Sequence, residues 1–311
     1  MTDAIIRTEH LSRFFGSVKA VDDLSLEVPA GIVFGFLGPN GAGKTTTIHL
    51  LLGLLEPMHG QASVLGFDTR TQADEIRARI GALLEFAGLY ERMSAEDNLD
   101  FYGRIYHMPA PERRARIKEL LTHLELWDRR ADQVGKWSRG MKQKLAVARA
   151  LFHHPPLIFL DEPTAGFDPI AAAALRNDLA SLVAREGVTV FLTTHNLSEA
   201  EKLCAQVGVI RQGKLVTVGN PDELRLRTGG PQAEIIGHGF NEQTLTLLRE
   251  RPEVANAELH NSHLTIELRG ESEIGPLVSL IVRSGGEVEE VRRGKASLED
   301  VFLTLMEEEN K

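Results

Sequence analysis

The sequence contains a single cysteine, Cys204, so no disulfide can form within the chain. Secreted domains often depend on disulfides, whereas proteins of a reducing compartment keep their thiols free. We therefore expect a cytoplasmic protein in which Cys204 is a small buried apolar residue. A reactive thiol would need an exposed, electropositive environment.

Long hydrophobic runs are also missing. The apolar stretch Ile48–Leu55 is interrupted by His49 and followed by Glu56, and no run approaches the roughly 20 residues that a helix needs to cross a bilayer. Residues Met1–Ile6 include Asp3 and show no basic segment before an apolar one, so we expect no signal peptide. We therefore expect that the chain does not cross a membrane by itself.

An excess of basic residues is the third absence. The chain has 44 acidic and 35 basic residues and a formal net charge of −9. A general nucleic-acid-binding protein normally carries a basic face, so this composition argues against one and no nucleic-acid partner is expected. The length of 311 residues suits one large α/β domain with a small appendage.

The hydrophobic pattern predicts strands that alternate with helices. Residues 5–36 read as strands, and the following elements are a helix at Lys44–Leu55, a helical stretch from about Ser94 to Ala150, a buried strand at Leu157–Leu160, a helix at Ile170–Arg185 and a strand at Val188–Thr193. Such alternation indicates a parallel sheet covered on both faces. The helical stretch predicts an inserted subdomain of about residues 86–150.

A second, smaller domain is predicted after the turn-forming segment Gly229-Gly230-Pro231. Its expected elements are strand Ala233–Gly237, helix Asn241–Arg249, strands Val254–His260 and His263–Arg269, helix Ile274–Ser284, strand Glu287–Arg293 and a last helix Leu298–Glu308. This order is typical of the ferredoxin-like α+β fold. We therefore predict one domain at residues 1–228 and another at 231–311.

The strongest chemical signal is a glycine-rich segment between a predicted strand and a predicted helix. It reads Gly38-Pro39-Asn40-Gly41-Ala42-Gly43-Lys44-Thr45 and fits the phosphate-loop pattern of nucleotide-hydrolysing proteins. Backbone amides of such a loop surround phosphates, Lys44 can reach the β- and γ-phosphates, and the Thr45 hydroxyl can bind Mg²⁺. These eight residues and the next one, Thr46, are candidate ATP-binding residues.

A second signal is the apolar strand Leu157–Leu160, which ends in Asp161 and Glu162. Paired carboxylates at a strand end often form only a solvated turn, but downstream of a phosphate loop they resemble the Walker B element. In that interpretation Asp161 holds Mg²⁺ and Glu162 polarises the attacking water.

These two signals leave the broad P-loop class open, which includes kinases, GTPases, helicases and cassette-type ATPases. The deciding segment is Trp137-Ser138-Arg139-Gly140-Met141, which resembles the LSGGQ signature of ATP-binding-cassette (ABC) proteins. Ser138 and Gly140 hold matching positions, and a serine hydroxyl with backbone amides at a helix start can bind an anion. Arg139 and Met141 depart from the usual glycine and glutamine.

The resemblance to ABC proteins covers nearly all of residues 4–225, and it implies further roles. Phe15 matches the aromatic residue that stacks on adenine, and His195 matches the switch histidine that contacts the γ-phosphate. The segment Ala165–Asp168 resembles the D-loop, which in the family runs along a dimer interface. The implied fold is a P-loop NTPase of the ABC ATPase type.

Glu85 is a departure from the family pattern, because glutamine is usual at the end of this strand. A carboxylate can bind Mg²⁺ and orient water, so Glu85 is a further candidate metal and nucleotide ligand. It would also add negative charge beside the γ-phosphate. The segment Gly88–Leu99 resembles the loop through which the family contacts its membrane subunit.

The C-terminal segment Ser297–Leu303 is similar to the tail of daunorubicin-resistance-type exporter ATPases. Together the resemblances imply a Mg²⁺-dependent ATPase subunit that works as a head-to-tail homodimer with C₂ symmetry. It would lie at the inner face of the membrane, bound to a separate permease, with the second domain in a regulatory or dimerisation role. Two alternatives remain: a soluble ABC-type ATPase that acts on ribosomes or DNA, and a weakly active cassette in an asymmetric pair.

Overall fold

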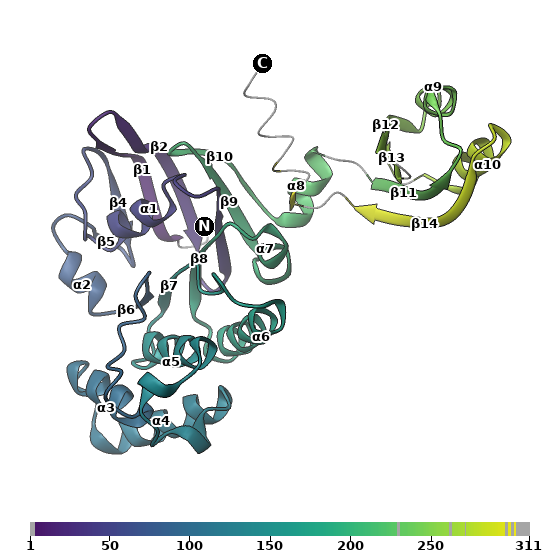
Figure 1. The fold of residues 1–311 in the computed structure, drawn as a ribbon. Coiled ribbons are helices and arrows are strands. Elements are labelled where there is room, and N and C mark those ends of the chain that lie inside the picture. Colours follow the sequence, from purple (N-terminus) through teal and green to yellow (C-terminus); the bar gives the residue numbers. More distant parts are fainter. Residues whose placement is uncertain are drawn as a thin grey trace. The chain divides into compact units, whose positions relative to one another are not determined.

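The computed structural model describes residues 4–228, 231–260, 263–270, 272–295, 298–299 and 302. The chain divides into two compact units, Met1–Val218 and Gly219–Lys311 (Figure 1). In the described part of the chain, no helix combines the length and the apolar character needed to span a bilayer.

An antiparallel sheet begins the first unit, with strand order β2-β1-β4-β5. Its strands are β1 (Ala4–Phe15), β2 (Val18–Pro29), β4 (His59–Val64) and β5 (Phe67–Asp68). The β1–β2 hairpin pairs Ala4 with Pro29 at one end and Phe15 with Val18 at the other. Alternating residues such as Leu24, Leu26 and Val28 are buried, so one face of the hairpin joins the core.

A six-stranded sheet follows, in the order β10-β9-β3-β8-β7-β6. These strands are β3 (Val33–Leu37), β6 (Ile80–Leu83), β7 (Leu157–Asp161), β8 (Thr189–Thr194), β9 (Gln206–Arg211) and β10 (Lys214–Gly219). Pairing from β9 through β3, β8 and β7 to β6 is parallel. Every residue of β3, β7 and β8 is buried. The carboxyl ends of these strands therefore meet at one edge, where α/β sheets usually place their ligands.

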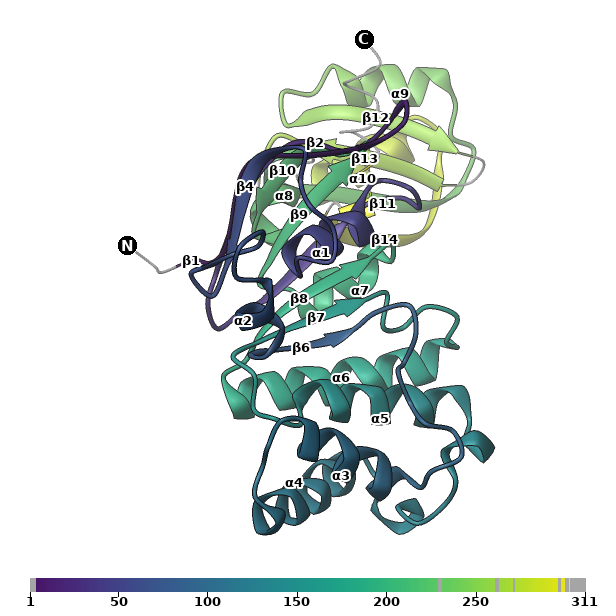
Figure 2. The same ribbon diagram turned by 90° about the vertical axis from the view of Figure 1, so that its left-hand side faces the viewer.

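Helices complete the first unit. They are α1 (Lys44–Leu51), α2 (Ala73–Arg77), α3 (Ala95–Ile105), α4 (Ala110–His123), the 3₁₀ turns η1 (Trp127–Arg129) and η2 (Val134–Lys136), α5 (Arg139–Leu151), α6 (Pro169–Glu186) and α7 (Leu197–Leu203). Helices α3, α4 and α5 gather at one end of the unit (Figure 2), at the place in the sequence where an inserted helical subdomain is predicted. Serine and asparagine caps start several of them: Ser94, Ser138 and Asn196 each accept a backbone N–H.

The first helix is shorter than predicted, because it ends at Leu51 and not at Leu55. Gly53 adopts a left-handed φ of 62°. Its amide donates to the Leu50 carbonyl at 3.1 Å, and the Leu54 amide donates to the His49 carbonyl at 2.9 Å. This is a Schellman ending, in which glycine stops the helix while the apolar run continues.

Cys204 is buried, as expected, at 7% exposure. Burial raises the pKa of its thiol to about 12, so the thiolate that reacts or binds metals is disfavoured.

The second unit contains the helix α8 (Pro221–Thr228) and a ferredoxin-like arrangement. Its elements are β11 (Pro231–His238), α9 (Glu242–Arg249), β12 (Val254–His260), β13 (His263–Leu268), α10 (Gly275–Arg283) and β14 (Glu287–Lys295). The antiparallel sheet has the order β12-β13-β11-β14. Leu248 of α9 and Ile281 of α10 share one apolar core with Ile235 and Ile266 of the sheet.

The predicted fold class is therefore confirmed, an α/β unit with a helical insertion followed by a small antiparallel α+β unit. The predicted last helix, Leu298–Glu308, lies largely outside the described residues.

Candidate functional site

The phosphate loop connects the buried strand β3 to helix α1, as the pattern predicts. Two glycines are dictated by space. A Cβ at Gly43, where φ is 111°, would lie 2.1 Å from the Ala20 carbonyl oxygen, and one at Gly38 would lie 2.3 Å from the Ile210 carbonyl oxygen. At both positions the backbone of the loop lies so close to a neighbouring carbonyl that only glycine fits. The loop leads directly into the start of α1, where free backbone amides can bind an anion.

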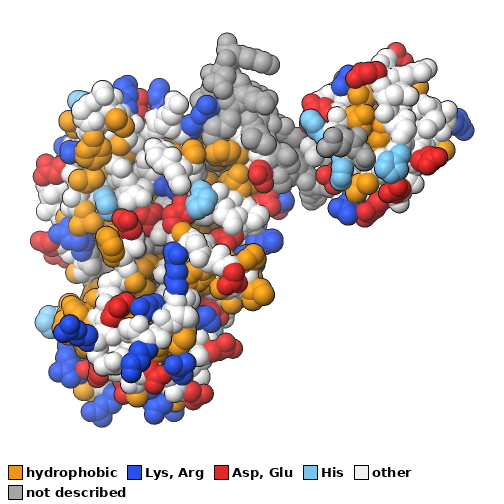
Figure 3. All heavy atoms as spheres, viewed as in Figure 1, with side chains coloured by type: hydrophobic (Ala, Val, Ile, Leu, Met, Phe, Trp, Pro, Cys, Tyr) orange, Lys and Arg blue, Asp and Glu red, His pale blue; other side chains and the backbone are white. Residues whose placement is uncertain are grey.

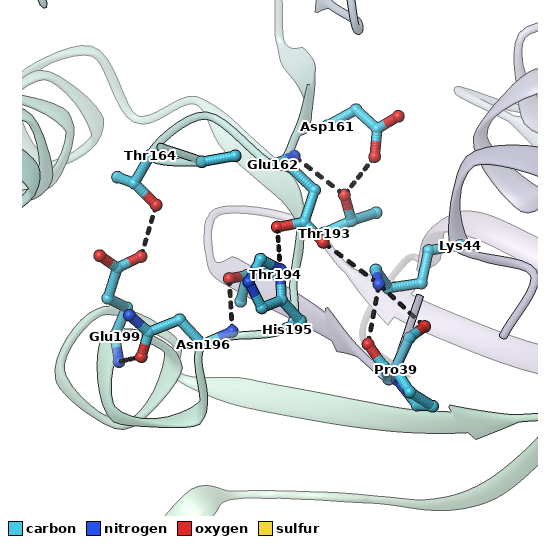
Figure 4. A network of polar contacts seen from close by, with 12 residues as sticks. Pro39, Lys44, Asp161, Glu162, Thr164, Thr193, Thr194, His195, Asn196 and Glu199 are labelled. Carbon is cyan, nitrogen blue, oxygen red and sulfur yellow. Dashed lines mark hydrogen bonds and ion pairs between the residues drawn. The ribbon is translucent and has the colours of Figure 1, made fainter. Parts of the chain in front are cut away.

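Lys44 is almost completely buried, with 6% of its surface exposed. Its ammonium Nζ donates to the carbonyl oxygens of Gly38 at 2.7 Å and Pro39 at 3.2 Å. It also forms an ion pair with Glu162 Oε1 at 3.1 Å (Figure 4). A buried ammonium needs such partners, because desolvation without them is costly. The phosphate loop and the end of β7 are thus joined through one side chain.

Asp161 ends strand β7 and is 8% exposed. Its Oδ2 accepts a hydrogen bond from the Thr45 hydroxyl at 2.8 Å, and its Oδ1 accepts one from the Thr193 hydroxyl at 2.5 Å. The structure thus brings together two of the three residues predicted to bind Mg²⁺, Thr45 and Asp161. Thr193 was missed by the sequence reasoning, although a threonine at the end of β8 and two residues before His195 is a usable signal.

The donor set at Asp161 and Thr45 fits Mg²⁺. This ion commonly binds one or two protein oxygens and completes its shell with water and substrate phosphates. The described residues contain no cluster of three or more acidic, histidine or cysteine side chains that could hold a metal without such help.

Glu162 lies directly after β7 with a positive φ of 49°, an uncommon conformation for a residue with a side chain. Its amide is held by the carbonyl and the hydroxyl of Thr193, both at 3.1 Å. His195 lies just after β8, and its Nδ1 is 2.8 Å from Glu162 Oε2 (Figure 4). The glutamate therefore links Lys44 on one side to His195 on the other.

A pocket of 210 Å³ lies over the phosphate loop. It is lined by Val18, Ala20, Asn40, Gly41, Gly43, Lys44, Thr45, Thr46 and Glu162. Val18 and Ala20, at the start of β2, were missed because apolar strand residues carry no chemical signal. The predicted adenine-stacking residue, Phe15, ends β1 opposite Val18, is 46% exposed and is not one of these lining residues. The Arg13 guanidinium lies over its ring, 5.0 Å from the centroid, so adenine stacking on Phe15 stays a prediction. Ala42, a residue of the loop that was predicted at the site, is buried and does not line the pocket.

Glu85 is exposed and lies two residues beyond the end of β6. Among the described residues, no hydrogen bond or ion pair connects it to Asp161, Thr45 or any other side chain. Its predicted role as a metal ligand stays a prediction.

Ser138 and Gly140 begin helix α5, and the Ser138 hydroxyl accepts the Met141 amide at 3.3 Å. Within the part of the chain that is described, neither residue is hydrogen-bonded to the phosphate loop.

A second hollow, of 530 Å³, adjoins Glu162 and His195 on the side of the predicted D-loop. Thr164, Gly166, Phe167, Arg176 and Glu199 are among its lining residues. The Thr164 hydroxyl donates to Glu199 Oε2 at 2.6 Å (Figure 4). Glu199 is 8% exposed and was also missed by the sequence reasoning.

Comparisons with known proteins agree with this geometry. The family described as "ABC transporter" matches residues 21–165, and the C-terminal domain of DrrA1-3-like ATP-binding proteins matches residues 219–306. The bacitracin transport ATP-binding protein BcrA of Bacillus licheniformis is 36% identical over 304 residues, which covers 97% of each chain. The daunorubicin resistance ATP-binding protein DrrA3 of Streptomyces coeruleorubidus is 36% identical over 98% of this chain and 96% of its own.

A solved structure of an ATP-binding subunit of an ABC transporter superposes with a TM-score of 0.65. It is 30% identical and covers 72% of this chain and 92% of its own length. The relatives match nearly the whole chain at 36% identity, and the phosphate loop lies beside Asp161, Glu162 and His195. The predicted resemblance is confirmed: the chain belongs to the ATP-binding subunits of the ABC transporter family.

Proposed function

We propose that this subunit hydrolyses Mg²⁺-bound ATP and uses the energy to drive a separate transmembrane partner of an export system. The observation that carries the proposal is the line of charged groups from Lys44 through Glu162 to His195, directly beside the Asp161–Thr45 pair. A cation for phosphates, a carboxylate for water and a metal-binding pair are the parts that phosphoryl transfer to water requires.

ATP binding would exchange the partners of Lys44. Its ammonium now contacts two loop carbonyls and Glu162, and phosphate oxygens would replace at least the carboxylate. Glu162 would then be free to accept a proton from the attacking water, while His195 holds the other carboxylate oxygen. Bound at Asp161 and Thr45, Mg²⁺ would neutralise charge that develops on the phosphates.

The signature residues Ser138 and Gly140 would act on the nucleotide of a second copy. At the start of α5 they present a hydroxyl and backbone amides suited to an anion, and in a head-to-tail dimer this site would close over the γ-phosphate held by the partner's phosphate loop. ATP would then favour the closed pair by its higher affinity for that state.

Coupling to the membrane would use an aromatic surface of the helical subdomain. Phe86 is 82% exposed, and Tyr90 and Phe101 are also exposed, with ring centroids 4.9 Å apart. Acidic and basic side chains are interspersed around this subdomain in the lower part of Figure 3, and some form local pairs, such as Arg104–Asp100 at 2.7 Å. Exposed apolar groups in such a surface are suited to a protein partner.

The names of the relatives favour transport over the ribosome- and DNA-linked alternative. They describe bacitracin transport, daunorubicin resistance and, in Cupriavidus metallidurans, Nod factor export, the last at 38% identity over 97% of each chain. Because the cargoes differ while the ATP-binding subunits are alike, we propose that the permease selects the cargo.

The coupling proposal is tested at Gly88, whose carbonyl accepts the Tyr102 hydroxyl at 2.5 Å. Gly88→Arg should abolish association with the membrane partner and transport while basal ATP hydrolysis continues. Gly187→Arg is the matched control, because Gly187 also has a left-handed φ and has open space around it. Sedimentation of the native protein with ribosomes or nucleoid, and never with membranes, would replace transport by the alternative.

A further inference from the structure

Two side chains of helix α5 hold the backbone that follows Glu162. Gln143 Nε2 donates to the Pro163 carbonyl at 2.8 Å, and Arg139 Nη2 donates to the Ala165 carbonyl at 2.5 Å. Gln143 lies one turn into the helix, whereas Arg139 is its first residue. Arg139 is also one of the two residues, with Met141, that depart from the usual LSGGQ signature, and a glycine at this position could not make the side-chain contact to Ala165.

The Arg139 guanidinium is fitted to the loop in two further ways. It lies 5.9 Å from the centroid of the Phe167 ring, within the range of a cation–π contact. It also fills the space beside Gly166, where an added Cβ would be 2.4 Å from Arg139 Nη1. Gly166 has a left-handed φ of 72°, so the loop presents a bare backbone to the guanidinium.

A short chain of contacts connects this arginine to Glu162. The carbonyl of Ala165 receives Arg139, and the amide of the same residue donates to the Glu162 carbonyl at 3.0 Å. On the other side of the loop, Glu199 accepts the Thr164 hydroxyl. In the described part of the chain, no hydrogen bond of Arg139 reaches the phosphate loop.

We infer that Arg139 is a positioning residue that ties the signature end of α5 to the loop Pro163–Asp168 and thereby holds Glu162 in its orientation. The functional consequence rests on the proposed ATPase activity, in which Glu162 accepts the proton from water. Removal of the tie should slow hydrolysis and leave nucleotide binding at the phosphate loop unchanged.

The structural part is tested without ATP turnover, by amide hydrogen exchange of the loop in the full-length, nucleotide-free protein. Arg139→Met should speed exchange of the amides of Thr164–Asp168 by about threefold to tenfold, the worth of one hydrogen bond. Arg139→Lys, which can still donate one bond, should give a smaller change. Arg130→Met is the control, because Arg130 likewise contacts an aromatic ring and a carbonyl, those of Trp127.

Gly166→Ala supplies a second test, since its methyl group would displace the same guanidinium. In a double-mutant cycle measured by loop exchange, its effect should be smaller in the Arg139→Met background than in the native protein. If the effects of the two substitutions on loop exchange add, or if the loop of Arg139→Met exchanges as fast as that of the native protein, Arg139 does not hold the loop.

The catalytic part is tested by steady-state kinetics. Arg139→Met should lower kcat by about threefold to tenfold and leave the Kd for ATP unchanged. A Kd that weakens in parallel with kcat would overturn the positioning role and point to direct phosphate contact. If the native protein hydrolyses no ATP, the proposed function fails, while the exchange experiment still decides whether Arg139 orders the loop.

Discussion

The buried Lys44 side chain already lies in the position in which we expect it to bind phosphate. The lysine is 6% exposed, so its charge needs partners in every state, and three oxygen atoms of the chain supply them. Phosphate oxygens offer the same ammonium a stronger, doubly charged partner. We therefore propose that nucleotide binding would exchange contacts at Lys44, whose ammonium group already lies inside the site.

Lys44→Ala should weaken ATP binding by about tenfold or more, because it removes the ammonium group that contacts the Gly38 and Pro39 carbonyls of the loop. The Kd can be measured by calorimetry with ATP and Mg²⁺. Lys118→Ala, an exposed lysine of α4, should bind ATP as the native protein does. Equal Kd values for all three proteins would contradict the assignment of Lys44.

Glu85→Gln tests whether the Glu85 carboxylate is a metal ligand. If Glu85 reaches the metal in the closed complex, the variant should need about threefold more Mg²⁺ for half-maximal turnover, because an amide is the weaker ligand. Its affinity for ATP should change less. Metal titrations that superimpose on those of the native protein would show that Glu85 points elsewhere.

Much of the residue-level site is readable from sequence because its chemistry is concentrated in contiguous motifs. Gly38–Thr45 and Asp161–Glu162 are local patterns, and their positions after buried strands identify one sheet edge. The hydrogen bond from Thr193 to Asp161 and the one from Thr164, in the loop after Glu162, to Glu199 could not be predicted. The two residues of each bond lie 32 and 35 positions apart along the chain, so the bonds depend on how the fold orients their side chains.

A buried arginine of α4 is one of the side chains that join the helical subdomain to the rest of its unit. Arg116 of α4 is 2% exposed, donates to the Leu151 carbonyl at 2.8 Å and pairs with Glu186 at the end of α6 at 2.6 Å. Burial raises the pKa of Glu186, but hydrogen bonds and charge from Arg116 and Arg185 outweigh it, so the pKa is lowered overall.

Arg116→Met should lower the free energy of unfolding by about 3 kcal/mol, because it leaves a largely buried carboxylate without its main partner. Arg114→Met, on the exposed side of the same helix, should change it by less than about 0.5 kcal/mol. Urea unfolding followed by circular dichroism measures both. A cost as small as that of the control would contradict an anchoring role.

The difference in the free energy of unfolding between the native and Arg116→Met proteins should also depend on pH. The folded-state pKa of Glu186 is below the ordinary value of 4.5. Its stabilisation is therefore complete above that value and is lost as the pH falls through the lower, folded-state pKa. The gap in stability between native and Arg116→Met proteins should narrow in this acidic window and stay constant between pH of about 6 and 8.

Element boundaries follow sequence periodicity where capping agrees with it. The strand predicted at Val254–His260 has the same bounds in β12, and a turn at residues 252–253 precedes it. Helix α1 ends earlier than its apolar pattern, since Gly53 completes a Schellman ending while Leu54 and Leu55 continue into the following loop. Hydrophobic periodicity therefore predicts that an element exists more accurately than it predicts the residue at which the element ends.

On the scale of the whole molecule, we propose that the two units have separate tasks. The described residues of the nucleotide pocket all belong to Met1–Val218, and the second unit has an apolar core of its own. We propose that residues 231–311 form a domain that tunes pairing or coupling and is dispensable for ATP binding.

A chain truncated after Arg227 should therefore bind ATP with the affinity of the full-length protein. Its fold can be checked by circular dichroism and its Kd by calorimetry. A soluble, folded truncated protein that fails to bind ATP would show that the second unit contributes to the site.

We propose that Glu162 activates the water that cleaves ATP, and the direct measurement is the steady-state turnover of Glu162→Gln at fixed free Mg²⁺. The variant keeps the shape of the side chain and loses its charge, so turnover should fall by at least about tenfold while ATP still binds. ATP-bound dimers should then accumulate on size exclusion. Turnover equal to that of the native protein would contradict the account.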